Sequence, residues 1–111
     1  MIEDLIKTIR ERKNSSSDKS YTSSLLSGGL SKCIDKLEEE FNELKDALKS
    51  KNNQVHESAD VIYHLLVALE AADVKFEDVL KELEKRKGQS GIEEKKERKW
   101  ATTIIIYLQR Y

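Results

Sequence analysis

The chain has 111 residues, a length that suits one small domain, and it holds four glycines and no proline. Because few residues interrupt helices, this composition favours long helices over sheets. Acidic and basic residues nearly cancel, giving a formal net charge of -1, whereas a general binder of nucleic acid presents a net positive surface. The single cysteine excludes an internal disulfide and a cysteine-rich zinc site.

The sequence carries no sign of a secreted or membrane-spanning protein. The N-terminal stretch MIEDLIKTIRERK lacks the apolar core of a signal peptide. No run of about 18 apolar residues could span a bilayer. We therefore expect a cytoplasmic protein that binds neither membranes nor nucleic acid.

Apolar residues recur at helical spacing along most of the chain and predict an all-α bundle of four or five helices. A short helix is expected after Ser20, whose hydroxyl can cap it, and before Gly28-Gly29, which should end it. The other predicted helices span residues 2–13, 30–51, 55–72 and 76–87. Residues 1–91 form the predicted domain, and residues 92–111 are a tail, first charged and then apolar, that could be a strand, a docking segment or a partly disordered end.

The helix over residues 30–51 carries an apolar seam with alternating spacings of four and three. So small a domain buries little apolar surface on its own, so we expect this seam to complete a core shared with a second copy, in a homodimer or larger homo-oligomer. The seam residues are Leu30, Ile34, Leu37, Phe41, Leu44 and Leu48.

Acidic residues line the flank of this seam. On a helical wheel Glu40 and Glu43 lie beside the seam and face one way, with Glu39 a little further round. Glu38 points elsewhere and is expected to be solvated. An E-x-x-E pair on a charged helix is common and usually solvated, so Glu40 and Glu43 alone indicate little.

The helix over residues 55–72 favours a binding site over a solvated helix face. Apolar residues cover nearly its whole circumference, which is typical of a buried helix. Yet Glu57, Asp60 and His64 share one strip about 60° wide. Buried carboxylates without partners are costly, so these acids need a cation, a proton or a solvated cleft.

The two acidic pairs can meet in space. Glu40 with Glu43 and Glu57 with Asp60 are both i, i+3 pairs, so each projects from one helix face. The 13 residues between the pairs end one helix and start an antiparallel one. Four carboxylates in one cleft repel each other unless a divalent cation neutralises them, and hard oxygen ligands favour Mg²⁺, or Mn²⁺, over zinc.

Other catalytic motifs are absent. HESAD ends in Asp60 where the zinc motif H-E-x-x-H needs histidine, and neither a P-loop nor a G-x-G-x-x-G turn occurs. Phosphate groups would have to be bound by metal, by lysine and arginine, and by helix N-termini.

The frame E-x-x-E, a gap, then E-x-x-D on paired helices resembles the all-α nucleoside triphosphate pyrophosphohydrolase superfamily, the MazG-like fold. Within it, IRERK, SYTSSLLSGG, KCIDKLEEEFNEL, ESADVIYHLLVAL and DVLKELEKRKGQSG, over residues 2–91, look like the phosphoribosyl-ATP pyrophosphohydrolase family. Glu38 stands where that family usually has a small residue, and the apolar tail after Trp100 is not typical of it.

The resemblance implies hydrolysis of phosphoribosyl-ATP to phosphoribosyl-AMP and pyrophosphate, the second step of histidine biosynthesis. It implies Mg²⁺ held by Glu40, Glu43, Glu57 and Asp60, with Glu39 as the candidate base toward water. Residues of matching blocks that could contact the substrate are Arg12, Lys13, Tyr21, Lys32, Lys36, His64 and Arg86.

Two rival hypotheses stay open. A house-cleaning pyrophosphatase for ordinary or damaged nucleoside triphosphates would share the acidic frame. A non-catalytic helical dimer that binds a partner through its seam would tolerate amide replacements at Glu57 and Asp60.

Overall fold

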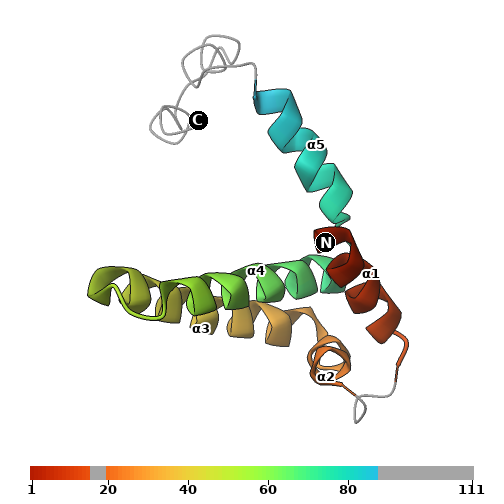
Figure 1. The fold of residues 1–111 in the computed structure, drawn as a ribbon. Coiled ribbons are helices and arrows are strands. Elements are labelled where there is room, and N and C mark those ends of the chain that lie inside the picture. The colour runs from red at the N-terminus through yellow and green to blue at the C-terminus, as the bar shows by residue number, and fades with distance from the viewer. Residues whose placement is uncertain (16–19, 88–111) are drawn as a thin grey trace, which may run out of the picture. The chain divides into compact units, whose positions relative to one another are not determined.

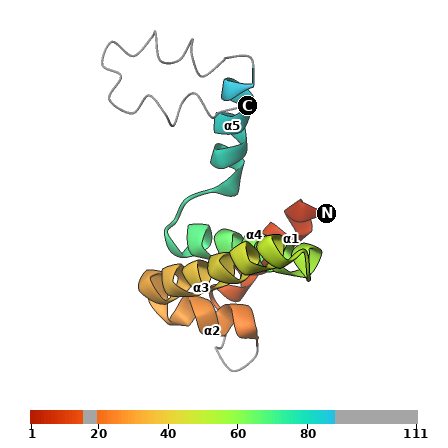
Figure 2. The ribbon, with the colours of Figure 1, turned by 90° about the vertical axis from the view of Figure 1, so that its left-hand side faces the viewer.

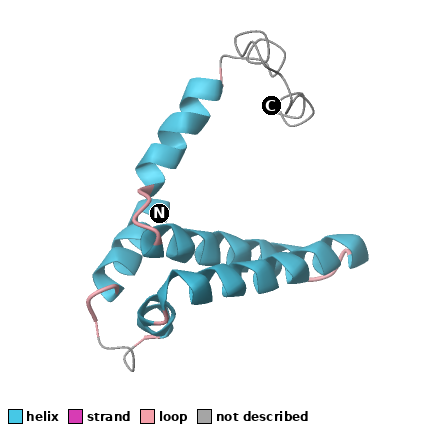
Figure 3. Cartoon of the chain, turned by 180° about the vertical axis from the view of Figure 1, so that it is seen from behind, coloured by secondary structure: helices cyan, strands magenta, loops and turns pink. Residues whose placement is uncertain are grey.

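The structure is a computed structural model, and it describes residues 1–15 and 20–87. Every regular element in these residues is a helix (Figure 3). The all-α prediction is therefore confirmed, and each predicted helix boundary agrees within two residues. The linker at residues 88–91 and the tail at 92–111 lie outside the described residues. The helices are α1 (Ile2–Arg12), α2 (Tyr21–Ser27), α3 (Gly29–Ser50), α4 (Gln54–Ala71) and α5 (Phe76–Arg86).

The chain divides into two compact units, Met1–Phe76 and the part from Glu77 onward, which carries most of α5. In the first unit α3 and α4 form a long antiparallel hairpin, as Figures 1 and 2 show from two sides. Helices α1 and α2 both contact α4, and α2 also contacts the start of α3. This unit therefore holds both acidic segments.

Local sequence accounts for the helix ends. The Ser20 hydroxyl accepts a hydrogen bond from the Ser23 amide at 2.9 Å, and this cap starts α2 as predicted. Gly28 ends α2, and Gly29 opens α3 with a φ of 87°, a left-handed conformation that glycine adopts without strain. The turn between α3 and α4 places Lys51 and Asn53 in the same region, with φ of 56° and 55°.

The core lies where α1 and α2 meet the first turns of α3 and the second half of α4. The Cys33 thiol is buried there and donates a hydrogen bond to the Leu25 carbonyl at 3.3 Å. Burial raises the pKa of this thiol, so Cys33 acts as a packed apolar group rather than a nucleophile. The buried apolar residues of this core are Ile6, Ile9, Leu25, Cys33, Leu66, Val67 and Ala68.

Most of the apolar seam of α3 lies outside the core of the single chain, although Leu37 packs against it. Phe41 is 53% exposed, and Leu30, Ile34 and Leu48 are similarly exposed. The buried face of α3 runs instead through Cys33 and Ala47. The neighbouring flank, on which Glu40 was expected, is therefore the one that faces α4.

Helix α4 is likewise less enclosed than its composition predicts. Val55 is 85% exposed and Ile62 is 49% exposed. A shallow groove runs along this part of α4, lined by Gln54, Val55, Ser58, Ala59 and Ile62. The expectation that this helix is buried all round is therefore wrong for the single chain, because no element of the first unit covers these side chains.

Helix α5 is amphipathic, and none of its residues is buried. Its apolar side chains Leu80 and Leu83 are both more than two-fifths exposed. Among the described helices, none combines the length and the apolar composition that a membrane crossing requires.

Candidate active site

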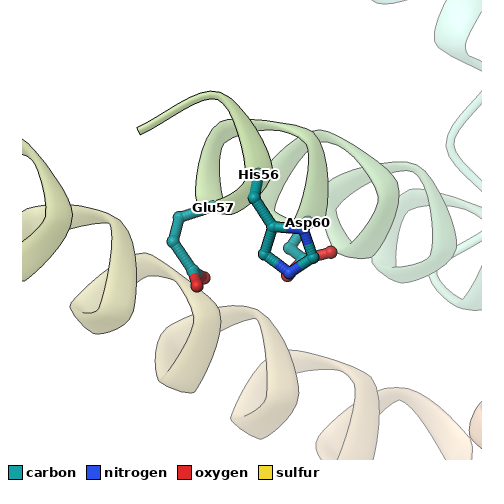
Figure 4. Close-up of side chains that lie close together, drawn as sticks. All are labelled: His56, Glu57 and Asp60. Atoms are coloured by element: carbon teal, nitrogen blue, oxygen red, sulfur yellow. The ribbon is translucent and has the colours of Figure 1, made fainter. Parts of the chain in front are cut away.

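The α3–α4 hairpin brings the two acidic pairs together. Glu40, Glu43 and Glu57 each offer a carboxylate oxygen, and these oxygens lie within 4.8 Å of one another. On α4, ligand atoms of His56, Glu57 and Asp60 lie within the same distance. Figure 4 shows these three α4 side chains, with Glu57 directed toward the neighbouring helix. Glu57 belongs to both groups and so links them.

Two carboxylate oxygens in this cluster are buried and lack a hydrogen-bond partner, namely Oε2 of Glu40 and Oε2 of Glu57. Burial, followed by the nearby Glu43, raises the pKa of both carboxyl groups. Leaving such oxygens without a donor or a cation is unfavourable. Among the described residues no donor or cation reaches these two oxygens, so the cluster can accept a proton or a positively charged ligand.

His64 lies directly beside this cluster, within the hairpin. It is only 5% exposed, and its Nε2 is 3.7 Å from Oε1 of Glu40. Burial, with a contribution from the Lys36 ammonium, lowers the pKa of the imidazole. The ring is therefore neutral near pH 7 and packs against Glu40 without neutralising its charge.

Glu39 and Lys36 lie at the edge of the cluster. Lys36 Nζ is 3.2 Å from Oε2 of Glu39, and this contact raises the pKa of the ammonium. Glu39 is 56% exposed and stays accessible to water. Lys36 is thus a fixed cation beside the carboxylates, at a place where a phosphate oxygen could replace Glu39 as its partner.

His56 is a member of the cluster that the sequence analysis missed. Its Nε2 lies 3.3 Å from Oδ2 of Asp60, one helical turn away. The signal was the i, i+4 spacing of histidine and aspartate on one helix face. A comparison of HESAD with the zinc motif H-E-x-x-H does not reveal this pair, because that motif requires a histidine where Asp60 stands.

Two of the predicted substrate contacts have other partners here. Lys13 Nζ lies 2.7 Å from Oδ1 of Asp73 and donates to the Glu70 carbonyl, so it covers the C-terminus of α4. Lys32 lies over the Gly28 turn and donates to the Ser24 carbonyl at 3.5 Å. Both cations satisfy helix-end carbonyls, a common structural role for lysine.

The two predicted arginine contacts belong to α1 and α5. Arg12 is exposed near the end of α1, where its carbonyl accepts a hydrogen bond from the Ser23 hydroxyl at 3.0 Å. Arg86 belongs to the second compact unit and pairs with Glu82 on α5, with Nε and Oε1 2.9 Å apart. Among the described residues of the first unit, the Arg12 guanidinium has no partner among the carboxylates of α3 and α4.

Comparisons of the sequence with a family model and with known proteins point to the same family. A family model described as phosphoribosyl-ATP pyrophosphohydrolase matches residues 2–87. A phosphoribosyl-ATP pyrophosphatase of Ruegeria pomeroyi is 47% identical over 97 residues, which cover 86% of this chain and 92% of that protein. A protein of the same name from Rhizobium etli is 42% identical over 97 residues, or 86% of this chain and 91% of its own.

A further relative is a bifunctional protein. The histidine biosynthesis bifunctional protein HisIE of Helicobacter hepaticus is 44% identical over 101 residues, which cover 89% of this chain and 44% of that protein. No solved structure matches the chain.

Proposed function

Because the chain belongs to the phosphoribosyl-ATP pyrophosphohydrolase family, we propose that it hydrolyses phosphoribosyl-ATP to phosphoribosyl-AMP and pyrophosphate, a step of histidine biosynthesis. The observation that carries this proposal is the meeting of Glu40 and Glu43 with Glu57 between α3 and α4. A triphosphate needs compensating positive charge at the bond that breaks, and this cluster is suited to recruit it.

The residues present fit a Mg²⁺ ion, or Mn²⁺. The two partnerless buried oxygens of Glu40 and Glu57 are hard donors, and Glu43 and Asp60 add further carboxylates within reach. His56 would join this set through Asp60. When bound there, the ion would offset the charge of the phosphate oxygens and of the leaving pyrophosphate.

Lys36 and Glu39 would bind phosphate and accept a proton, respectively. In the proposed reaction water attacks at the α–β phosphoanhydride, its proton passes to the Glu39 carboxylate, and pyrophosphate leaves. Lys36 contacts Glu39 in the free chain and donates to a phosphate oxygen when substrate is bound. That exchange frees Glu39 to accept the proton, so the same ion pair would hold both groups ready for the reaction.

The functional unit is proposed to be a homodimer or a larger homo-oligomer. The exposed seam of α3, with Phe41 at 53% and Leu48 at 54%, supports this, together with the exposed Val55 and Ile62 of α4. Large apolar side chains that cluster at the surface mark interaction sites. A second copy would cover these side chains and close the shallow groove along α4.

Pyrophosphate release from phosphoribosyl-ATP, measured with Mg²⁺ against ATP, dUTP and dCTP, tests the proposal. Release from phosphoribosyl-ATP alone is the expected result. Release from the plain nucleotides would instead assign the chain to the house-cleaning pyrophosphatases. No release from any of them would favour a non-catalytic helical protein.

A further inference from the structure

Three aromatic rings pack together beside the carboxylate cluster. The rings of Tyr21 and Tyr63 are stacked, with centroids 6.3 Å apart and planes at 23°. The His64 ring meets both edge-on, with centroids 5.9 Å from Tyr21 and 5.0 Å from Tyr63. We call these three residues the aromatic platform.

The platform is held in place by the stretch Ser20-Tyr21-Thr22. The Ser20 hydroxyl caps α2, so the first turn that carries Tyr21 is fixed. The Thr22 hydroxyl is 2.5 Å from the Tyr63 hydroxyl, which ties α2 to α4. Tyr63 and His64 are thus engaged in the fold, whereas Tyr21 remains 55% exposed.

What distinguishes Tyr21 from the other exposed apolar side chains is that its ring is supported by two further rings beside the carboxylate cluster. The hydrogen bonds of α2 determine where Tyr21 stands, but its ring contributes little to the core because more than half of it is exposed. A flat ring presented in this way is suited to stack another flat ring, such as a nucleobase.

The platform also has the right neighbours for one end of a nucleotide. His64 joins it to Glu40, at 3.7 Å, and so to the carboxylates. The Lys36 ammonium lies close enough to Tyr21 and His64 to interact with both, and it pairs with Glu39 at 3.2 Å. Along the hairpin the order is therefore aromatic rings, then a fixed cation, then the carboxylate cluster.

We propose that the aromatic platform binds the adenine ring of the substrate by stacking on Tyr21, and that it sets the distance from the base to the carboxylate cluster. This inference rests on the proposed function, because it assigns the base of the same substrate. The triphosphate then passes Lys36 on its way to Glu40 and Glu57. Tyr63 and His64 are positioning residues, since they support the ring that the base contacts.

The test compares Tyr21→Phe, which keeps the ring, with Tyr21→Leu, which keeps an apolar side chain without it. Each purified variant is assayed for turnover of phosphoribosyl-ATP, and calorimetry measures its binding of phosphoribosyl-AMP and of inorganic pyrophosphate. Pyrophosphate carries no base, so it serves as the internal control. Circular dichroism melting and light scattering check that fold and oligomeric state are unchanged.

For Tyr21→Leu we expect KM for phosphoribosyl-ATP and Kd for phosphoribosyl-AMP to rise on the order of tenfold, the scale of one base–aromatic stack. Its pyrophosphate affinity should be unchanged, and Tyr21→Phe should behave like the wild type. Equal KM and Kd values in Tyr21→Leu and in the wild type would overturn the inference. A Tyr21→Leu variant that changes its oligomeric state but binds phosphoribosyl-AMP as tightly as the wild type would overturn it as well. A wild-type chain that binds phosphoribosyl-AMP but releases no pyrophosphate would contradict the proposed function alone.

Discussion

The two sides of the α3–α4 hairpin show opposite arrangements of polar and apolar groups. Between the helices lie Glu40 and Glu57, each with one buried carboxylate oxygen that has no hydrogen-bond partner. On the solvent side of the same helices lie Phe41 and Ile62, both about half exposed. A single chain gains nothing from either arrangement. In the proposed function a cation neutralises the first side, and the apolar surface of a second copy covers the second.

The largest expected effect is on the carboxylate side. Glu57→Gln keeps the size of the side chain but removes a charge, so pyrophosphate release from phosphoribosyl-ATP should fall by about a thousandfold or more, while helicity is retained. Asp60→Asn should behave similarly. Glu38→Gln, at an exposed position of α3, is the matched control and should retain full turnover. Mg²⁺-dependent activity preserved in both Glu57→Gln and Asp60→Asn would refute the assigned site.

The solvent side is tested by introducing a charge. Phe41→Glu should turn an oligomer into a monomer on size-exclusion chromatography with light scattering, because burial of a phenylalanine contributes about 1.5–3 kcal/mol per copy. Asn42→Glu, at the next and likewise exposed position, should leave the assembly intact. A wild-type chain that elutes as a monomer at all concentrations would instead remove the need for a partner.

An effect of intermediate size on the stability of the folded chain is expected from Mg²⁺ and from pH. Burial raises the pKa of Glu40 and Glu57 above the ordinary 4.5, so the folded chain binds protons more tightly than the unfolded chain. Without metal, the contribution of these two groups to the free energy of unfolding should therefore be largest below about pH 4.5. It should decrease as the pH rises through their raised pKa values. Mg²⁺ at a hundredfold excess over its Kd should add about 2.7 kcal/mol at neutral pH.

Thermal melts with Mg²⁺ and with EDTA, across pH 5 to 8, measure this effect. Glu57→Gln should flatten the pH dependence of the EDTA melts. Equal melting temperatures with and without Mg²⁺ at neutral pH would show that the cluster holds no cation in the free chain.

The smallest effect concerns Lys13. Asp73 at 2.7 Å raises the pKa of Lys13, and the ion pair lowers the pKa of Asp73 in return. The stability from this pair is present above the unfolded pKa of the aspartate and is lost as pH falls through its lowered value. Asp73 is exposed, so Lys13→Met should reduce thermal stability slightly, and high salt should remove the difference.

The KM of Lys13→Met distinguishes two roles. An unchanged KM for phosphoribosyl-ATP is expected if Lys13 serves only to cover the C-terminus of α4. A large rise in KM would restore Lys13 to the substrate contacts that the sequence suggested.

The sequence predicted the helices and the meeting of the acidic pairs, because both depend on local periodicity and on the short α3–α4 turn. It also predicted Ser20 as a cap, a choice decided by one side chain and one amide. It could not show which face of α3 the single chain buries, since the exposed seam through Phe41 is more apolar than the buried flank through Cys33 and Ala47. Pairings between distant segments, such as Lys13 with Asp73 and Thr22 with Tyr63, leave no periodic signal.

The short turn at Lys51–Asn53 has a further consequence for folding. Glu40 and Glu57 belong to one hairpin, and contacts so close in sequence form early in folding. We therefore expect the hairpin to be part of the folding nucleus, with the repulsion among its carboxylates already present in the transition state. Mg²⁺ should then accelerate folding as well as slow unfolding, and the folding arm of a chevron plot with and without Mg²⁺ measures this. A folding rate that does not respond to Mg²⁺ would place the closing of the cluster after the rate-limiting step.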